Sequence, residues 1–138
     1  MSRLNETNVD VIFTPYVEIS EKTKIKIRNG LQILSKDYGT IFSPGYLIRS
    51  NWIAMHMIAY RLNFLKQFNV RIDEKTSYDD VEYVQYYLPY AKTAIYFDDY
   101  VYQYRTNQVS QSCNRESLIR NEKKHEQVLM HCIEYYVN

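Results

Sequence analysis

The sequence contains no apolar run of the ~18 residues that a membrane-spanning helix requires. Its first residues, Met1 to Glu6, also lack the hydrophobic core of a secretory signal. The only cysteines are Cys113 and Cys132, and without a secretory context they indicate reduced thiols rather than a disulfide. These absences predict a cytoplasmic protein without a membrane span.

An excess of charge of one sign is also missing, because the formal net charge is only +1. Lysine and arginine are spread along the chain, and the densest clusters, residues 22–28 and 120–124, alternate with other residues as solvated faces do. The sequence therefore gives no electrostatic case for nucleic acid as a partner. With 138 residues, 46% of them hydrophobic, we expect one domain, with a core over residues 1–111 and a helical tail over 112–138.

Paired carboxylates stand at the start of a helix predicted over residues 78–88. Ser77 is the expected N-cap, with Asp80 three residues further on. Apolar residues recur along the predicted helix at Val81, Val84 and Leu88. Two interpretations are open: Asp79 and Asp80 complement the helix dipole, or one of them is a general base that faces a cleft.

Hydrophobic periodicity and turn residues predict the other elements. Strands are expected at residues 9–19 with a break at Pro15, and at 24–28, 53–60, 93–97 and 100–105; helices are expected at 31–38, 63–68 and from 115 onward. The last helix carries an apolar stripe that either docks on the body or forms a dimer seam. The stripe comprises His125, Val128, Leu129, Cys132, Ile133 and Tyr136. Neither His125 nor His131 shares a helix face with a carboxylate pair at metal spacing, so neither is expected to be a ligand.

Tyrosine is over-represented, with 15 residues against 5 phenylalanines and one tryptophan. A tyrosine ring combines a stacking face with a hydroxyl, so one use is to line a sugar-binding groove. We favour the other use, in which most of these rings pack at the edges of the core.

Five short segments follow one another over about a third of the chain. They read Arg61-Leu62-Asn63-Phe64-Leu65, Val70-Arg71-Ile72-Asp73, Tyr78-Asp79-Asp80-Val81, Ala91-Lys92 with Ala94-Ile95-Tyr96, and Tyr102-Gln103-Tyr104-Arg105. Their order and spacing resemble the acceptor-side half of family 2 glycosyltransferases of the GT-A type. The resemblance implies an α/β fold, a truncated GT-A fold in which a mixed sheet has flanking helices and a long C-terminal helix.

The resemblance also implies a reaction, the transfer of a sugar from a nucleoside diphosphate to an acceptor hydroxyl in glycan synthesis. Asp80 matches the family's catalytic base, and Asp79 is expected to contact or orient the acceptor. Arg105, with Gln108 or Ser110, is expected to steady the diphosphate. The implied partners are a nucleotide sugar and a glycan or lipid-linked acceptor, and the absence of a Gln-x-x-Arg-Trp motif argues against a processive synthase.

The family's Asp-x-Asp motif, which holds Mg²⁺ or Mn²⁺ on the diphosphate, has no counterpart here, since Asp98-Asp99 falls in a predicted turn. We therefore expect the C-terminal portion of an enzyme, with no cofactor of its own and a divalent cation in the complete protein. Loss of the other half would leave unpaired strand edges near residues 9–19 and 93–97, which predicts a homodimer. The alternative function is a non-catalytic binding or interaction module whose acids only cap the helix.

Overall fold

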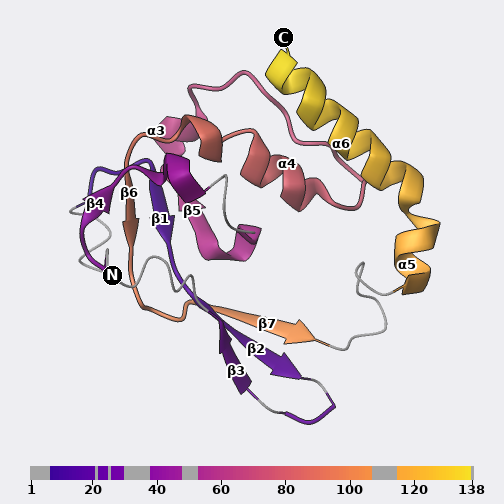
Figure 1. Cartoon of the computed structure of the whole chain (residues 1–138), viewed down its shortest axis with the longest axis horizontal. Coiled ribbons are helices and arrows are strands. Elements are labelled where there is room, and N and C mark those ends of the chain that lie inside the picture. Colours follow the sequence, from indigo (N-terminus) through magenta and orange to yellow (C-terminus); the bar gives the residue numbers. More distant parts are fainter. Residues whose placement is uncertain are drawn as a thin grey trace.

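The computed structural model describes residues 7–20, 22–24, 26–29, 38–47, 53–106 and 115–137. The strands are β1 (Val11–Phe13), β2 (Tyr16–Ser20), β3 (Lys26–Asn29), β4 (Ile41–Phe42), β5 (Ile58–Tyr60), β6 (Ala94–Tyr96) and β7 (Tyr102–Thr106). The α-helices are α3 (Leu62–Leu65), α4 (Asp79–Gln85), α5 (Arg115–Arg120) and α6 (Glu122–Val137), with 3-10 turns η2 (Pro44–Tyr46), η3 (Met55–Met57) and η4 (Leu88–Tyr90). The chain thus has mixed α/β content and ends in a helix, as predicted (Figure 1).

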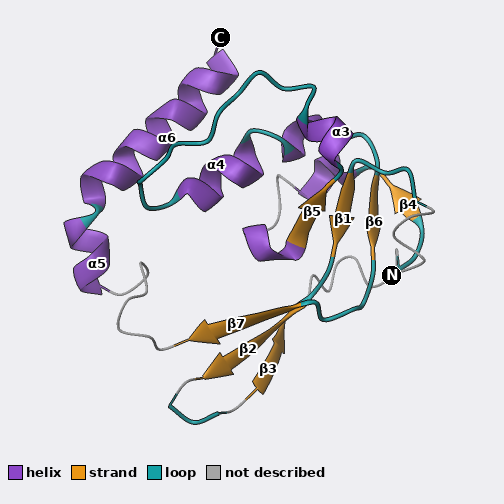
Figure 2. Cartoon of the chain, turned by 180° about the vertical axis from the view of Figure 1, so that it is seen from behind, coloured by secondary structure: helices purple, strands orange, loops and turns teal. Residues whose placement is uncertain are grey.

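The strands form two sheets, which Figure 2 shows as separate groups. In the four-stranded sheet, of order β4-β6-β1-β5, β1 pairs antiparallel with β5 and parallel with β6. In the three-stranded sheet, of order β3-β2-β7, β2 pairs antiparallel with β3 and parallel with β7. Pro15 lies where the chain passes from one sheet to the other, a position that needs no backbone donor.

Strands β1 and β6 each have a neighbour on both sides within the four-stranded sheet. The expectation of unpaired edges near residues 9–19 and 93–97 is therefore wrong, because β4 and β5, from the intervening sequence, cover them. The homodimer stays a prediction. The strand expected over residues 53–60 is also shorter than predicted: β1 ends at Phe13, so residues 55–57 have no strand to pair with and form η3 instead.

The predicted helix over residues 31–38 lies almost wholly outside the described residues, and Ser43-Pro44-Gly45 opens the 3-10 turn η2. No helix among the described segments is both long and apolar enough to cross a bilayer.

Asp10 joins β1 to the start of β6. One of its carboxylate oxygens, Oδ2, accepts hydrogen bonds from the backbone N–H groups of Lys92 and Thr93 at 3.0 and 3.1 Å. The other, Oδ1, pairs with Arg61 at 3.0 Å. Burial alone would raise the pKa of Asp10, but these hydrogen bonds lower it below its usual value. Asp10 therefore connects the start of β1 to the segment that leads into β6 and to Arg61.

The main core lies between the four-stranded sheet, α4 and α6, and tyrosines supply much of it. The Tyr60 ring packs against Phe64, Tyr83 and Tyr87, with centroid separations of 5.9, 5.1 and 5.6 Å. Burial raises the pKa values of Tyr60 and Tyr83. Packing at the core is therefore the main use of the tyrosines in this region.

Helix α6 lies beside α4 (Figure 1). Val128 and Cys132 of the predicted stripe are buried in the main core, whereas Leu129 and Ile133 stay exposed. One side of the stripe therefore docks on the body, and the other side stays exposed. Cys132 is a free thiol whose pKa burial raises to about 11, and Cys113 lies outside the described residues.

Candidate functional site

The carboxylate helix α4 begins at an unusual residue. Tyr78 is its N-cap and adopts a left-handed backbone conformation, with φ 75°, which costs a non-glycine residue roughly 1–2 kcal/mol. No side chain caps the helix, so the prediction that Ser77 is a capping N-cap is wrong. The Tyr78 ring packs on His125 of α6, with centroids 4.5 Å apart. Tyr78 therefore contacts α6 at the strained turn that immediately precedes Asp79 and Asp80.

The two predicted acids lie in the first turn of α4, where Asp79 is exposed and Asp80 half-buried. The His56 ring of η3 stacks on Tyr102 and Tyr104 of β7, each with a centroid separation of 5.0 Å. The Tyr16 ring meets it edge-on at 4.3 Å.

The electrostatics of His56 link these groups. Burial lowers the pKa of His56, and the negative charges of Asp80 and Glu18 oppose that effect. Within the described segments, the buried Nε2 atom of His56 has no hydrogen-bond partner, an uncommon state for a buried polar atom. Two segments more than twenty residues apart, the aspartate pair and the tyrosine strand, therefore both lie near one imidazole. We call His56, Asp80, Tyr16, Tyr102 and Tyr104 the His56 cluster.

Not every predicted site residue joins the His56 cluster. Arg105 lies opposite Ile19 in the parallel pair of β2 and β7 and is exposed. Side chains alternate along a strand, so Arg105 lies on the opposite face of β7 from Tyr102 and Tyr104. Gln108 and Ser110 lie outside the described residues.

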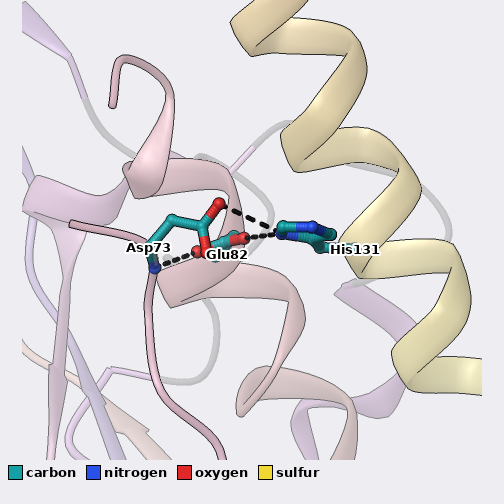
Figure 3. A group of neighbouring side chains, drawn as sticks. All are labelled: Asp73, Glu82 and His131. Atoms are coloured by element: carbon teal, nitrogen blue, oxygen red, sulfur yellow. Dashed lines mark hydrogen bonds and ion pairs between the residues drawn. The ribbon is translucent and has the colours of Figure 1, made fainter. Parts of the chain in front are cut away.

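A second group of polar side chains lies on another face of α4. Glu82 of α4 is fully buried, at 0% exposure, while Asp73 comes from the loop before α4 and His131 from α6. His131 Nδ1 is 3.0 Å from Asp73 Oδ2 and 3.7 Å from Glu82 Oε1. Figure 3 shows the three side chains converging from their three segments. We call them the Asp73–Glu82–His131 group.

Hydrogen bonds hold both carboxylates of this group in place. The Tyr86 hydroxyl donates to Glu82 Oε1 at 3.0 Å, and the Asp73 backbone N–H donates to Glu82 Oε2 at 2.7 Å. The Gln127 amide donates to Asp73 Oδ2 at 3.0 Å. Burial, followed by the hydrogen bond to Glu82, raises the pKa of Tyr86.

The pattern of the last helix does not reveal this group, and the expectation that His131 has no carboxylate partners is wrong. Both carboxylates come from outside the helix that carries His131. The sequence does contain one sign of the group, which is Glu82. It lies four residues before Tyr86, on a helix face that is otherwise aromatic. A carboxylate on a buried helix face requires a partner.

The acidic pair Asp98-Asp99 lies exposed in the loop between β6 and β7, as predicted, and the Tyr96 hydroxyl donates to Asp98 at 3.3 Å. Comparison of the chain with protein-family models, with curated proteins and with solved structures finds no match to any of them.

Proposed function

We propose that this chain is the acceptor-side portion of a GT-A glycosyltransferase that transfers a sugar from a nucleoside diphosphate to an acceptor hydroxyl. The observation that carries the proposal is the His56 cluster. It brings the Asp79-Asp80 pair and the tyrosine strand, two of the five segments that resemble the family, to one imidazole. A half-buried carboxylate and a group of stacked aromatic rings that both interact with one imidazole would suit an acceptor sugar, because aromatic rings can cover its apolar face while a carboxylate binds its hydroxyl.

In this proposal Asp80 takes the proton from the acceptor hydroxyl while that oxygen attacks the anomeric carbon of the donor. The bond from the anomeric carbon to the diphosphate breaks in the same step, and the nucleoside diphosphate leaves with the bonding electrons. Asp79, exposed at the start of α4, orients the acceptor. Arg105, Gln108 and Ser110 remain proposed contacts of the diphosphate.

The resembling family uses a divalent cation on the diphosphate, and the residues described here do not fit that site. Asp98 and Asp99 are exposed on a loop, and the sequence contains no Asp-x-Asp motif. Glu82 of the other acidic group is two residues from Asp80, about 200° around the helix. We therefore assign no step to a cation held by this chain.

The test is a transfer assay on the protein with any sequence that precedes this chain, against a panel of nucleotide sugars and glycan acceptors. Asp80→Asn should lower turnover by about a hundredfold or more, the loss expected for a general base. The matched control is Asp99→Asn, an exposed aspartate in the β6–β7 loop, which should keep normal turnover.

Near-normal turnover in Asp80→Asn would support the second candidate, a non-catalytic binding module. In that case the substitution should cost only about 1 kcal/mol of stability through weaker interaction with the helix dipole.

A further inference from the structure

We propose that the Asp73–Glu82–His131 group binds one Zn²⁺ ion, which clamps α6 to α4 and to the loop before it. The proposal goes beyond the transfer reaction and does not depend on it. It rests on the separations of three ligand atoms, on the charge of the group and on the hydrogen bonds around it.

The separations suit a tetrahedral ion. Zinc binds nitrogen and carboxylate oxygen at about 2.0–2.2 Å, so neighbouring ligand atoms of a tetrahedral site lie about 3.3–3.6 Å apart. His131 Nδ1 lies 3.0 Å from Asp73 Oδ2 and 3.7 Å from Glu82 Oε1. All three ligand atoms lie within 4.8 Å of one another. Shifts of a few tenths of an ångström would bring both separations from His131 to the tetrahedral spacing.

The charge of the group also favours a cation. Two carboxylates face one imidazole, and one of the carboxylates is fully buried. Among the residues that the structure describes, no lysine or arginine pairs with either of them. A buried carboxylate requires a compensating charge, and a divalent ion supplies enough for both.

The surroundings resemble the outer layer of a metal site, in which ligating groups are themselves held by hydrogen bonds. Gln127 holds Asp73, while the Tyr86 hydroxyl and the Asp73 backbone N–H hold Glu82. Each carboxylate oxygen has two lone pairs, so the hydrogen bond to Glu82 Oε1 leaves one for a metal. His131 is 38% exposed, which leaves a path for the ion and for a water as fourth ligand.

Zinc fits better than the hard cations. Imidazole suits zinc and other transition metals, whereas Mg²⁺ and Ca²⁺ prefer oxygen ligands only. The site also differs in position from any cation at Asp80, since Glu82 lies on the other side of α4. Its three protein ligands come from α6, α4 and the loop before α4, so we assign it the role of joining these segments.

The experiment titrates ZnCl₂ into tag-free, chelator-treated chain by calorimetry, with MgCl₂ as a parallel arm. Wild type should bind one Zn²⁺ per chain and not respond to Mg²⁺. Removal of an outer-layer partner of a metal typically costs about 10–100-fold in affinity, and His131→Ala, which removes a ligand, should cost at least as much. Asp73→Asn should weaken binding as well.

The matched control is His125→Ala, which removes the other histidine of α6 without touching the group. It should keep the wild-type affinity. Zinc should also raise the midpoint of thermal unfolding of wild type and of His125→Ala, but not that of His131→Ala. The proposal is overturned if wild type shows no saturable binding at millimolar Zn²⁺, or if His131→Ala and Asp73→Asn both bind as wild type does.

Discussion

Replacement of Glu82 by alanine should lower the free energy of unfolding by about 3–5 kcal/mol, even with no metal present. The Glu82 side chain is fully buried, and it accepts hydrogen bonds from the Tyr86 hydroxyl and the Asp73 backbone N–H. In Glu82→Ala both donors lose their acceptor, and a buried donor left unsatisfied costs about 1–3 kcal/mol. The substitution also leaves a cavity and removes the more distant of the two carboxylates that lie beside His131.

Two milder variants separate these contributions. Tyr86→Phe removes only the hydroxyl that donates to Glu82, so it should cost about 1.5–3 kcal/mol, as for a hydrogen bond to a charged group. Glu82→Gln keeps most of the volume and a carbonyl acceptor, so its loss should be smaller than that of Glu82→Ala. In the double variant Glu82→Ala/Tyr86→Phe the two losses should not add, because both remove the same hydrogen bond.

The assay is urea unfolding followed by far-UV circular dichroism, with chelator in every sample and linear extrapolation to water. Small domains have only about 5–15 kcal/mol of stability, so Glu82→Ala can unfold much of the protein. In that case the loss of stability is measured on Tyr86→Phe. The buried network would be refuted if Glu82→Ala and Tyr86→Phe each lowered the free energy of unfolding by less than about 0.5 kcal/mol, the range of ordinary surface substitutions.

Two further predictions concern other parts of the core. Folding lowers the pKa of His56, so the folded state favours the neutral imidazole, and stability should fall as the pH drops through and below 6.5, the usual pKa of histidine. His56→Phe should remove this part of the pH dependence. If the difference in urea midpoint between neutral and acidic pH is the same in His56→Phe as in wild type, the prediction is contradicted. Val128→Ala should cost about 2 kcal/mol, because Val128 is fully buried between α6 and the main core. The exposed Val137→Ala on the same helix should cost under about 0.5 kcal/mol, and equal losses would mean that α6 does not dock.

Local pattern was enough to predict several elements. The alternation at residues 24–28, the helix after residue 78 and the apolar stripe of the last helix each appear in the structure as β3, α4 and α6, within a few residues. These elements follow from periodicity, because a strand or helix with one buried face repeats its apolar residues at a fixed interval. Pro15 likewise separates two strands because proline donates no backbone hydrogen bond.

The wrong predictions share one cause: contacts with residues distant in the sequence determined the local structure. The first half of residues 53–60 is not a strand, because β1 is too short to pair with it. The Ser77 cap is absent because the chain enters α4 through Tyr78, whose ring packs on His125 of a helix almost fifty residues later.

For the candidate sites, the sequence by itself determined that two carboxylates, Asp79 and Asp80, stand side by side at the start of α4. Only the tertiary structure decided which distant groups they meet. It stacked His56 on the tyrosines of β7, where the charge of Asp80 acts on the imidazole, and it brought Asp73, Glu82 and His131 together from three segments. The physical reason is that a helix or strand pattern fixes which side chains share a face, whereas the packing of elements fixes which faces meet.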